Sequence, residues 1–263
     1  MIRLVAIDVD GTLLTSGHEI TRGTAAAIER VRDAGVEIVL TTSRPPRALW
    51  PILEALGLTH PGVFVASQGA LVGSYSAEGE LRVLERQPMP VGLAQQVALA
   101  GDAAGMSVSW FAAERWLVPR LDDLIREESA IVGCAPEVAD LSAEREGPDK
   151  ILLLASPAGR DIAEAVAIPE GLVALASTPT HLEVTREDVD KGGALRRLCA
   201  TWGIAPGDVV AIGDGRNDLG MLAFAGVAVA PANAHPEVLA AADLVTSSND
   251  EDGVAQVLAQ LVP

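Results

Sequence analysis

Arg3-Leu-Val-Ala-Ile-Asp8-Val-Asp10-Gly11-Thr12-Leu-Leu14 is the segment from which the rest of this 263-residue sequence can be interpreted. Its short run of Leu, Val and Ile predicts a buried strand of a parallel sheet. Side chains alternate along a strand, so Asp8 and Asp10 are expected to project to the same side. Two carboxylates that close repel each other unless a cation or a proton lies between them. Gly11 would allow a sharp turn after the pair, and the Thr12 hydroxyl could stabilise that turn.

This acidic pair has more than one interpretation. The simplest is a strand end with two solvated acids. An EF-hand calcium loop is excluded by its spacing, because the sixth position counted from Asp8 is Leu13, where that loop requires Gly. The third interpretation is a nucleophilic carboxylate at Asp8 beside an acid/base at Asp10, with a divalent cation offsetting their charge. Other parts of the chain have to decide between the first and the third.

Composition narrows the class of protein. A formal net charge of −17 disfavours a nucleic-acid partner, because binding to a phosphate backbone needs a basic surface. The two cysteines, Cys134 and Cys199, are far apart and form no metal-binding motif, which predicts two buried thiols in a reduced compartment. No apolar run reaches the roughly 18 residues that a membrane span needs. We therefore expect a soluble cytoplasmic protein without a membrane partner.

Strands and helices alternate in the first and last parts of the chain, which predicts a doubly wound, Rossmann-like α/β sheet of parallel strands. The first helix is bounded by a Thr N-cap and a Gly stop, Thr21 and Gly35. The other elements expected in these parts are strands at 36–41, 62–66, 209–213, 227–230 and 244–246, and helices at 45–56, 191–202, 217–224, 236–242 and up to 261.

The pattern between these parts is different, with short strands in hairpins and separate helices. The expected strands are 70–75, 81–86, 107–111, 115–118, 150–154, 172–176 and 181–185, and the expected helices are 91–104, 121–129 and 160–167. We therefore expect a core domain at residues 1–85 and 186–263, interrupted by an inserted α+β domain at residues 86–185.

Polar residues follow several of the predicted core strands. Ligands of such sheets bind beyond the carboxyl ends of the strands, so these residues could converge on one crevice. Asp8 and Asp10 end the first strand, and Lys191 opens a helix of the second half. The remaining candidates are the segments Thr41-Thr42-Ser43-Arg44 and Gly213-Asp214-Gly215-Arg216-Asn217-Asp218.

With these motifs the sequence resembles the haloacid dehalogenase superfamily of phosphotransferases, in its Cof-type branch with the large α+β cap called type IIB. The first motif of that family, DxDGT, matches residues 8–12, and the second, a Thr after a hydrophobic strand, matches Thr42. The third, an isolated Lys that opens a helix, matches Lys191, and the fourth, GDGxNDxxML, matches residues 213–222. The specificity of this resemblance comes from four motifs in order across the whole chain.

The resemblance implies a mechanism. Asp8 would attack phosphorus to form an aspartyl-phosphate, while Asp10 would protonate the leaving oxygen and then activate water. It also implies a Mg²⁺ site with oxygen ligands from Asp8, the backbone carbonyl of Asp10, and Asp214. Asp218 would bind the metal directly or act through its neighbours.

The resemblance implies a phosphate site as well, formed by Thr42 with the adjacent Ser43, by Lys191 and by Asn217. Lysine occurs only at positions 150 and 191, and a compact ammonium suits a bridge between Asp8 and a phosphate oxygen. A purely structural lysine is disfavoured at a helix N-terminus, where cations fit poorly. Lys150 resembles a Lys common in this cap, and its role stays open between site and structure.

Two loops depart from the family pattern. Ser43 stands where the family often has Gly, and Gln68-Gly69-Ala70 stands where it often has Asn-Gly-Ala. Asn tolerates left-handed backbone geometry better than Gln does. These differences concern the loops that would face the substrate, and they leave the four motifs intact.

The function expected from this resemblance is Mg²⁺-dependent hydrolysis of a small soluble phosphomonoester, either a sugar phosphate or a cofactor phosphate. A phosphomutase would use the same residues, and a non-catalytic phospholigand-binding protein is the alternative from another class. Retention of Asp10 argues against the latter, because a sensor has no need of an acid/base. The sequence leaves the substrate open, and also the choice between a monomer and a homodimer.

Overall fold

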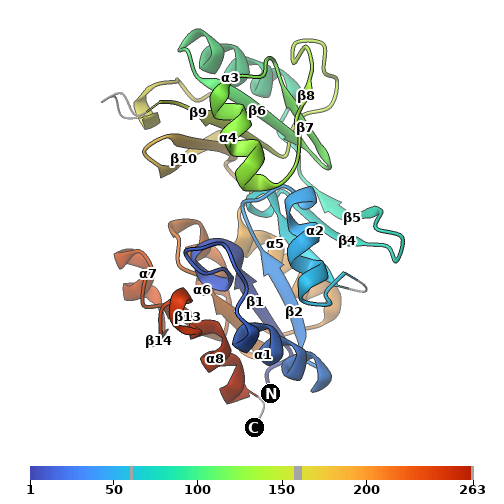
Figure 1. Cartoon of the computed structure of the whole chain (residues 1–263), viewed down its shortest axis with the longest axis vertical. Coiled ribbons are helices and arrows are strands. Elements are labelled where there is room, and N and C mark those ends of the chain that lie inside the picture. The colour runs from blue at the N-terminus through green and yellow to red at the C-terminus, as the bar shows by residue number, and fades with distance from the viewer. Residues whose placement is uncertain (60–61, 157–161, 262–263) are drawn as a thin grey trace. The chain divides into compact units, whose positions relative to one another are not determined.

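The computed structural model describes residues 1–59, 62–156 and 162–261, which form two compact units (Figure 1). The core unit consists of Met1–Ser43, Trp50–Leu84 and Asp190–Pro263. The cap unit consists of Glu85–Val189 together with Arg44–Leu49. Each unit is described by itself.

The core unit contains the strands of an eight-stranded sheet in the order β14-β13-β12-β1-β2-β3-β4-β5. The strands from β14 to β3 are parallel, and β4 is antiparallel to β3. The strands are β1 (Leu4–Asp8), β2 (Glu37–Thr41), β3 (Val63–Ala66), β4 (Leu71–Tyr75), β5 (Leu81–Arg86), β12 (Val209–Ile212), β13 (Val227–Pro231) and β14 (Leu244–Thr246). The predicted parallel α/β fold is confirmed.

The central strand β1 is buried along its whole length, as expected of a parallel strand with both faces covered. Its residues Leu4 and Ala6 belong to a buried cluster with the helices α5 (Lys191–Trp202), α6 (Leu219–Phe224) and α7 (Pro236–Ala241). Two other helices, α1 (Arg22–Asp33) and α8 (Gly253–Leu261), pack side by side and contact β2 and β14 (Figure 1).

Helix ends in the core unit follow their capping residues. The Thr21 hydroxyl accepts a hydrogen bond from the Thr24 amide at the start of α1, which confirms the predicted N-cap. Gly35, with φ +81°, follows the end of α1. Helix α5 begins after Asp190, whose carboxylate accepts a hydrogen bond from the Gly193 amide.

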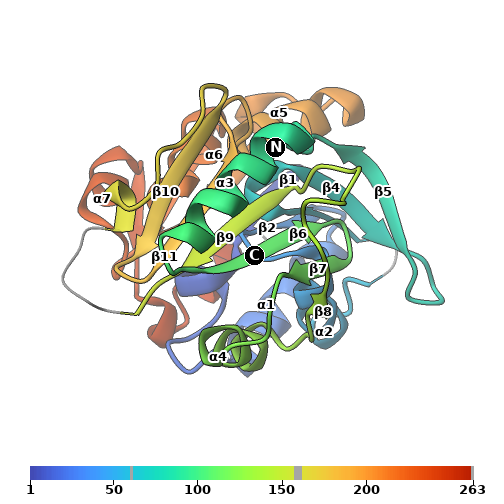
Figure 2. The same cartoon turned by 90° about the horizontal axis from the view of Figure 1, so that it is seen from above.

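The cap unit contains a six-stranded sheet in the order β10-β11-β9-β6-β7-β8. Helix α3 (Val91–Ala103) runs across this sheet, as Figure 2 shows, and helix α4 (Asp123–Val132) also contacts β6. A large buried cluster lies between α3 and the sheet, and a smaller one includes Phe111, Trp116 and Ile125 of α4. The strands are β6 (Ser107–Ala112), β7 (Arg115–Val118), β8 (Glu137–Val138), β9 (Lys150–Leu154), β10 (Leu172–Thr178) and β11 (His181–Arg186).

Three elements of the structure differ from what the sequence predicted. The first two residues of the predicted helix 160–167 lie outside the described residues, and the described part contains a single 3₁₀ turn, Ile162–Glu164, because the segment soon reaches Pro169. Strand β8 was not predicted, since two exposed residues carry no periodic signal. The predicted helix 217–224 is split into a 3₁₀ turn, Arg216–Asp218, and α6.

Both cysteines are free thiols, and Cys199 is buried as predicted, whereas Cys134 is only half-buried, so that the prediction of two buried thiols was wrong. Cys134 lies just after the end of α4, where it packs at the margin of the buried cluster of Phe111, Trp116 and Ile125. Among the described residues, no helix has the length and apolarity to cross a membrane.

Candidate active site

Strand alternation and helix periodicity bring Asp8 and Lys191 together. Ala6 of β1 packs in the same buried cluster as Leu195 of α5. Asp8, two residues after Ala6, projects to the same side of the sheet. Lys191 lies four residues before Leu195, and therefore on the same face of α5. An apolar contact between a strand and a helix thus places a carboxylate opposite an ammonium group.

Lys191 is buried between two carboxylates. Its Nζ lies 2.5 Å from Oδ1 of Asp8 and 2.7 Å from Oδ1 of Asp218, and the residue is only 1% exposed. Burial alone would lower the pKa of Lys191, but the attraction of Asp218 and Asp8 outweighs it and raises that pKa. Lys191, the first residue of α5, is therefore a permanently charged group beside the last residue of β1.

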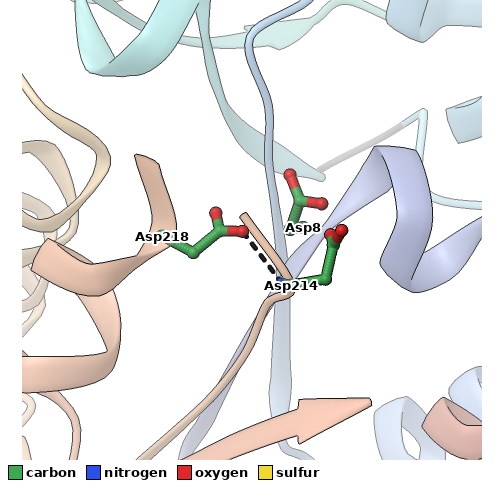
Figure 3. A group of neighbouring side chains, drawn as sticks. All are labelled: Asp8, Asp214 and Asp218. Carbon is green, nitrogen blue, oxygen red and sulfur yellow. Dashed lines mark hydrogen bonds between the residues drawn. The ribbon is translucent and has the colours of Figure 1, made fainter. Parts of the chain in front are cut away.

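The loop after β12 is built around Asp218. Its Oδ2 accepts a hydrogen bond from the backbone amide of Asp214 at 3.1 Å (Figure 3). It accepts another from the backbone amide of Gly215 at 2.9 Å. Asp218 thereby holds both the loop and Lys191. Asp214 is held from the other side, because the Thr12 hydroxyl donates to its Oδ1 over 2.8 Å. The Thr12 hydroxyl thus ties the first motif to the fourth.

Asp8, Asp214 and Asp218 form a carboxylate group in which one oxygen of each residue lies within 4.8 Å of the others (Figure 3). Burial, followed by the charge of Asp218, raises the pKa of Asp8 well above its ordinary value, and Lys191 opposes this effect. Burial also raises the pKa of Asp214, against the hydrogen bond from Thr12. Three carboxylates exceed the single ammonium group in charge, and oxygen ligands suit a hard divalent cation. The site can therefore hold a divalent metal.

Asp10 is placed differently from the sequence prediction. The strand ends at Asp8, and Val9–Leu13 forms a wide helical turn in which Gly11 has φ +81°. Asp10 lies beyond the end of the strand but has extended angles of its own, φ −84° and ψ 121°, so the projection of Asp8 and Asp10 to the same side stays a prediction. Asp10 is half-buried, and its side chain is not part of the carboxylate group found among the described residues. The predicted role of its backbone carbonyl does not depend on the side chain.

Two of the predicted phosphate-binding residues, Thr42 and Asn217, meet at one further residue, Gln68. Thr42 is buried directly after β2, and its carbonyl accepts a hydrogen bond of 3.1 Å from the Gln68 amide. Nδ2 of Asn217 donates to Oε1 of Gln68 over 3.0 Å. Ser43, next to Thr42, is half-buried. Sequence reasoning noted Gln68 only as a departure from the family pattern and missed these contacts.

Two asparagines hold the turn after β1. Nδ2 of Asn233 donates to the Gly11 carbonyl over 2.8 Å, and Asn249 donates from Nδ2 to the Leu14 carbonyl over 2.8 Å. The two are linked, because the Asn249 amide donates to Oδ1 of Asn233 over 2.9 Å. No pattern in the sequence around Asn249 announces this contact.

Lys150, whose role the sequence left open, is buried within the cap unit. Its Nζ lies 3.4 Å from Oε2 of Glu183 and 5.4 Å from the ring centre of Phe111. An ion pair and a cation–π contact inside one unit are sufficient to explain a buried lysine.

Comparison with known proteins gives a consistent result. A sequence profile described as haloacid dehalogenase-like hydrolase matches residues 5–258. YxeH of Bacillus subtilis is 31% identical over 274 residues, with 100% of this chain and 99% of YxeH covered. The pyridoxal phosphate phosphatase YbhA of Escherichia coli is 28% identical, with 97% of each chain covered. A crystal structure of a haloacid dehalogenase-like hydrolase from Bacteroides thetaiotaomicron superposes with a TM-score of 0.87 at 25% identity, covering 99% of this chain and 100% of the other.

Proposed function

Because the chain belongs to the haloacid dehalogenase-like hydrolases and is a phosphatase, we propose that it hydrolyses small phosphomonoesters through an aspartyl-phosphate on Asp8, with Mg²⁺ as its cofactor. The observation that carries this proposal is the buried pairing of Asp8 with Lys191 beside Asp214 and Asp218. The name of YbhA supports a cofactor phosphate or another small metabolite as the substrate class. The core domain at 1–85 and 186–263 would carry the chemistry, and 86–185 would form the inserted cap.

In the first step, an oxygen of Asp8 attacks phosphorus, and the bond from phosphorus to the ester oxygen breaks. Asp10 gives its proton to that leaving oxygen. Lys191 holds Asp8 in place and favours its ionised form, and it stabilises the negative charge that spreads over the phosphoryl oxygens. Thr42, Ser43 and Asn217 would bind the other phosphate oxygens.

In the second step, the Asp10 carboxylate takes a proton from water, and the water oxygen attacks the phosphorus of the aspartyl-phosphate. The bond to Asp8 breaks and inorganic phosphate leaves, which restores both aspartates. Asp8, the Asp10 carbonyl and Asp214 would hold Mg²⁺, with Asp218 as a further ligand or as the anchor of the loop. The metal would neutralise charge on the phosphate and orient it for attack.

The test is phosphate release from a panel of small phosphomonoesters, with Mg²⁺ or with EDTA, for the wild type and Asp8→Asn. We expect release that requires Mg²⁺ and disappears in Asp8→Asn. Asp33→Asn, which changes an exposed aspartate at the end of α1, is the matched control and should keep full activity. Transfer of the phosphate to another hydroxyl without its release would instead identify a mutase, and metal-dependent ligand binding without turnover would identify a sensor.

A further inference from the structure

The turn Ser67–Gly69, between β3 and β4, has an unusual backbone. Three successive residues have positive φ angles, 50° at Ser67, 61° at Gln68 and 100° at Gly69. Only glycine adopts such angles without a steric cost, so Ser67 and Gln68 both pay one. The Ser67 hydroxyl is also buried and has no hydrogen-bond partner among the described residues. A strained backbone of this kind persists only where the surrounding structure holds it in place, and such positions cluster at active sites.

This turn contacts Thr42 and Asn217, which are assigned to phosphate binding above, and the backbone just before Lys191. The Gln68 amide donates to the Thr42 carbonyl, and its side-chain oxygen accepts from Asn217. Gly69 lies against the residue that precedes Lys191, since a Cβ added to Gly69 would lie 2.2 Å from the Asp190 carbonyl oxygen. The turn Ser67–Gly69 therefore links the end of β2, the start of α5 and the loop after β12.

We propose that Gln68 is a positioning residue that orients the Asn217 amide toward a phosphate oxygen of the substrate. The amide nitrogen of Asn217 carries two hydrogens, and Gln68 accepts one of them. A side chain held in this way loses less rotamer freedom when the second hydrogen binds the substrate. This inference rests on the function proposed above, which makes Asn217 a phosphate ligand.

The length of the side chain explains why Gln stands here. Asn would fit the left-handed backbone at lower cost. It is shorter by one carbon–carbon bond of about 1.5 Å. The contact with Asn217 is already 3.0 Å long, so an asparagine oxygen would lie beyond hydrogen-bond distance. Gln68 therefore combines a strained backbone with a side chain long enough to contact Asn217.

Gln68→Met tests the proposal most directly, because it keeps the length and lack of branching and removes only the carboxamide. We expect kcat/KM to fall about tenfold, which is the effect of one lost orienting hydrogen bond. The kcat/KM of Asn217→Ala should fall at least as far. The kcat/KM of the double variant, Gln68→Met with Asn217→Ala, should equal that of Asn217→Ala alone. Once the Asn217 side chain is absent, Gln68 has no amide left to orient. Gln96→Met, at an exposed position of α3, should keep wild-type activity.

The affinity for inorganic phosphate with Mg²⁺ present, measured by calorimetry, is the second readout and should follow the same pattern. Gln68→Gly serves if Gln68→Met does not fold, because it relieves the backbone and should be the more stable of the two. Wild-type kcat/KM and phosphate affinity in either variant would overturn the proposal, as would losses that multiply in the double variant. If the wild type hydrolyses no ester, the proposed function fails, and phosphate affinity alone decides the role of Gln68.

Discussion

Lys191 carries the electrostatic balance of the site at the scale of single residues. Its ammonium group is the partner of two buried carboxylates, which remain buried when it is removed. Lys191→Met approximately keeps the length of the side chain and removes its charge. We expect the free energy of unfolding to fall by about 3–5 kcal/mol. Phosphate release should become undetectable, because Asp8 would lose the positive charge that positions it and favours its ionised form.

Denaturant unfolding and phosphate release measure these two effects. Lys150→Met, which changes the other lysine of the chain, is the matched control. It removes a buried ion pair in the cap unit and should reduce stability while leaving phosphate release measurable. Equal loss of activity in both variants would contradict a specific role for Lys191.

The stability of the folded protein should depend on pH through Cys199. Burial raises the pKa of its thiol to about 11. The unfolded chain therefore loses this proton at lower pH than the folded protein does, so that stability decreases as pH rises from about 8.5 toward 11. Cys199→Ala should reduce this slope. Alkylation by iodoacetamide at pH 9, followed by mass spectrometry, should modify the half-buried Cys134 well before Cys199, and the reverse order would contradict the assignment.

At the scale of elements, the close approach of α5 and α6 sets the distance from Lys191 to Asp218. A Cβ added to Gly192 would lie 2.3 Å from the carbonyl carbon and oxygen of Gly220. Gly192→Ala must therefore separate the two helices, and we expect the unfolding free energy to fall by about 1–3 kcal/mol together with kcat. Thermal unfolding and phosphate release are the measurements.

The neighbouring glycine is the matched control. A Cβ added to Gly193 would lie 3.2 Å from the Arg197 guanidinium and 3.3 Å from Oδ1 of Asp190, which are side-chain ends rather than the backbone that Gly192 meets. Alanine is the better helix former, so Gly193→Ala should be neutral or slightly stabilising and fully active. If both variants behaved alike, the contact between the helices could not be what positions Lys191.

At the scale of the whole molecule, metal binding should be visible in stability. A ligand that binds only the folded state stabilises it by about 2.7 kcal/mol at a hundred times its dissociation constant. We expect Mg²⁺ to raise the unfolding free energy of the wild type accordingly, and EDTA to reverse the effect. Asp214→Asn, which removes one carboxylate of the group, should lose most of this dependence. A wild-type protein with equal stability in both conditions would contradict the metal site.

Much of this molecule could be predicted from its sequence, for identifiable reasons. Apolar runs such as Leu4–Asp8 specify buried strands, and the rule for the carboxyl ends of strands groups Asp8, Thr42 and Asp214. The exact path of the backbone could not be predicted. Asp10 lies in a turn rather than a strand, and Gln68 adopts angles that its residue type disfavours. Contacts between distant segments decide such positions, as Asn249 does for the turn after β1.

The burial of both lysines has a consequence for the chemistry of the surface. Lys150 and Lys191 are 4% and 1% exposed, and the sequence contains no third lysine. The folded protein therefore presents guanidinium groups but almost no side-chain amines to reagents in water. Acylating reagents, cross-linkers and acetyl donors should therefore react slowly with these two amines in the folded protein and faster when the chain opens. The rate at which each lysine is labelled would then measure how readily its own part of the protein opens.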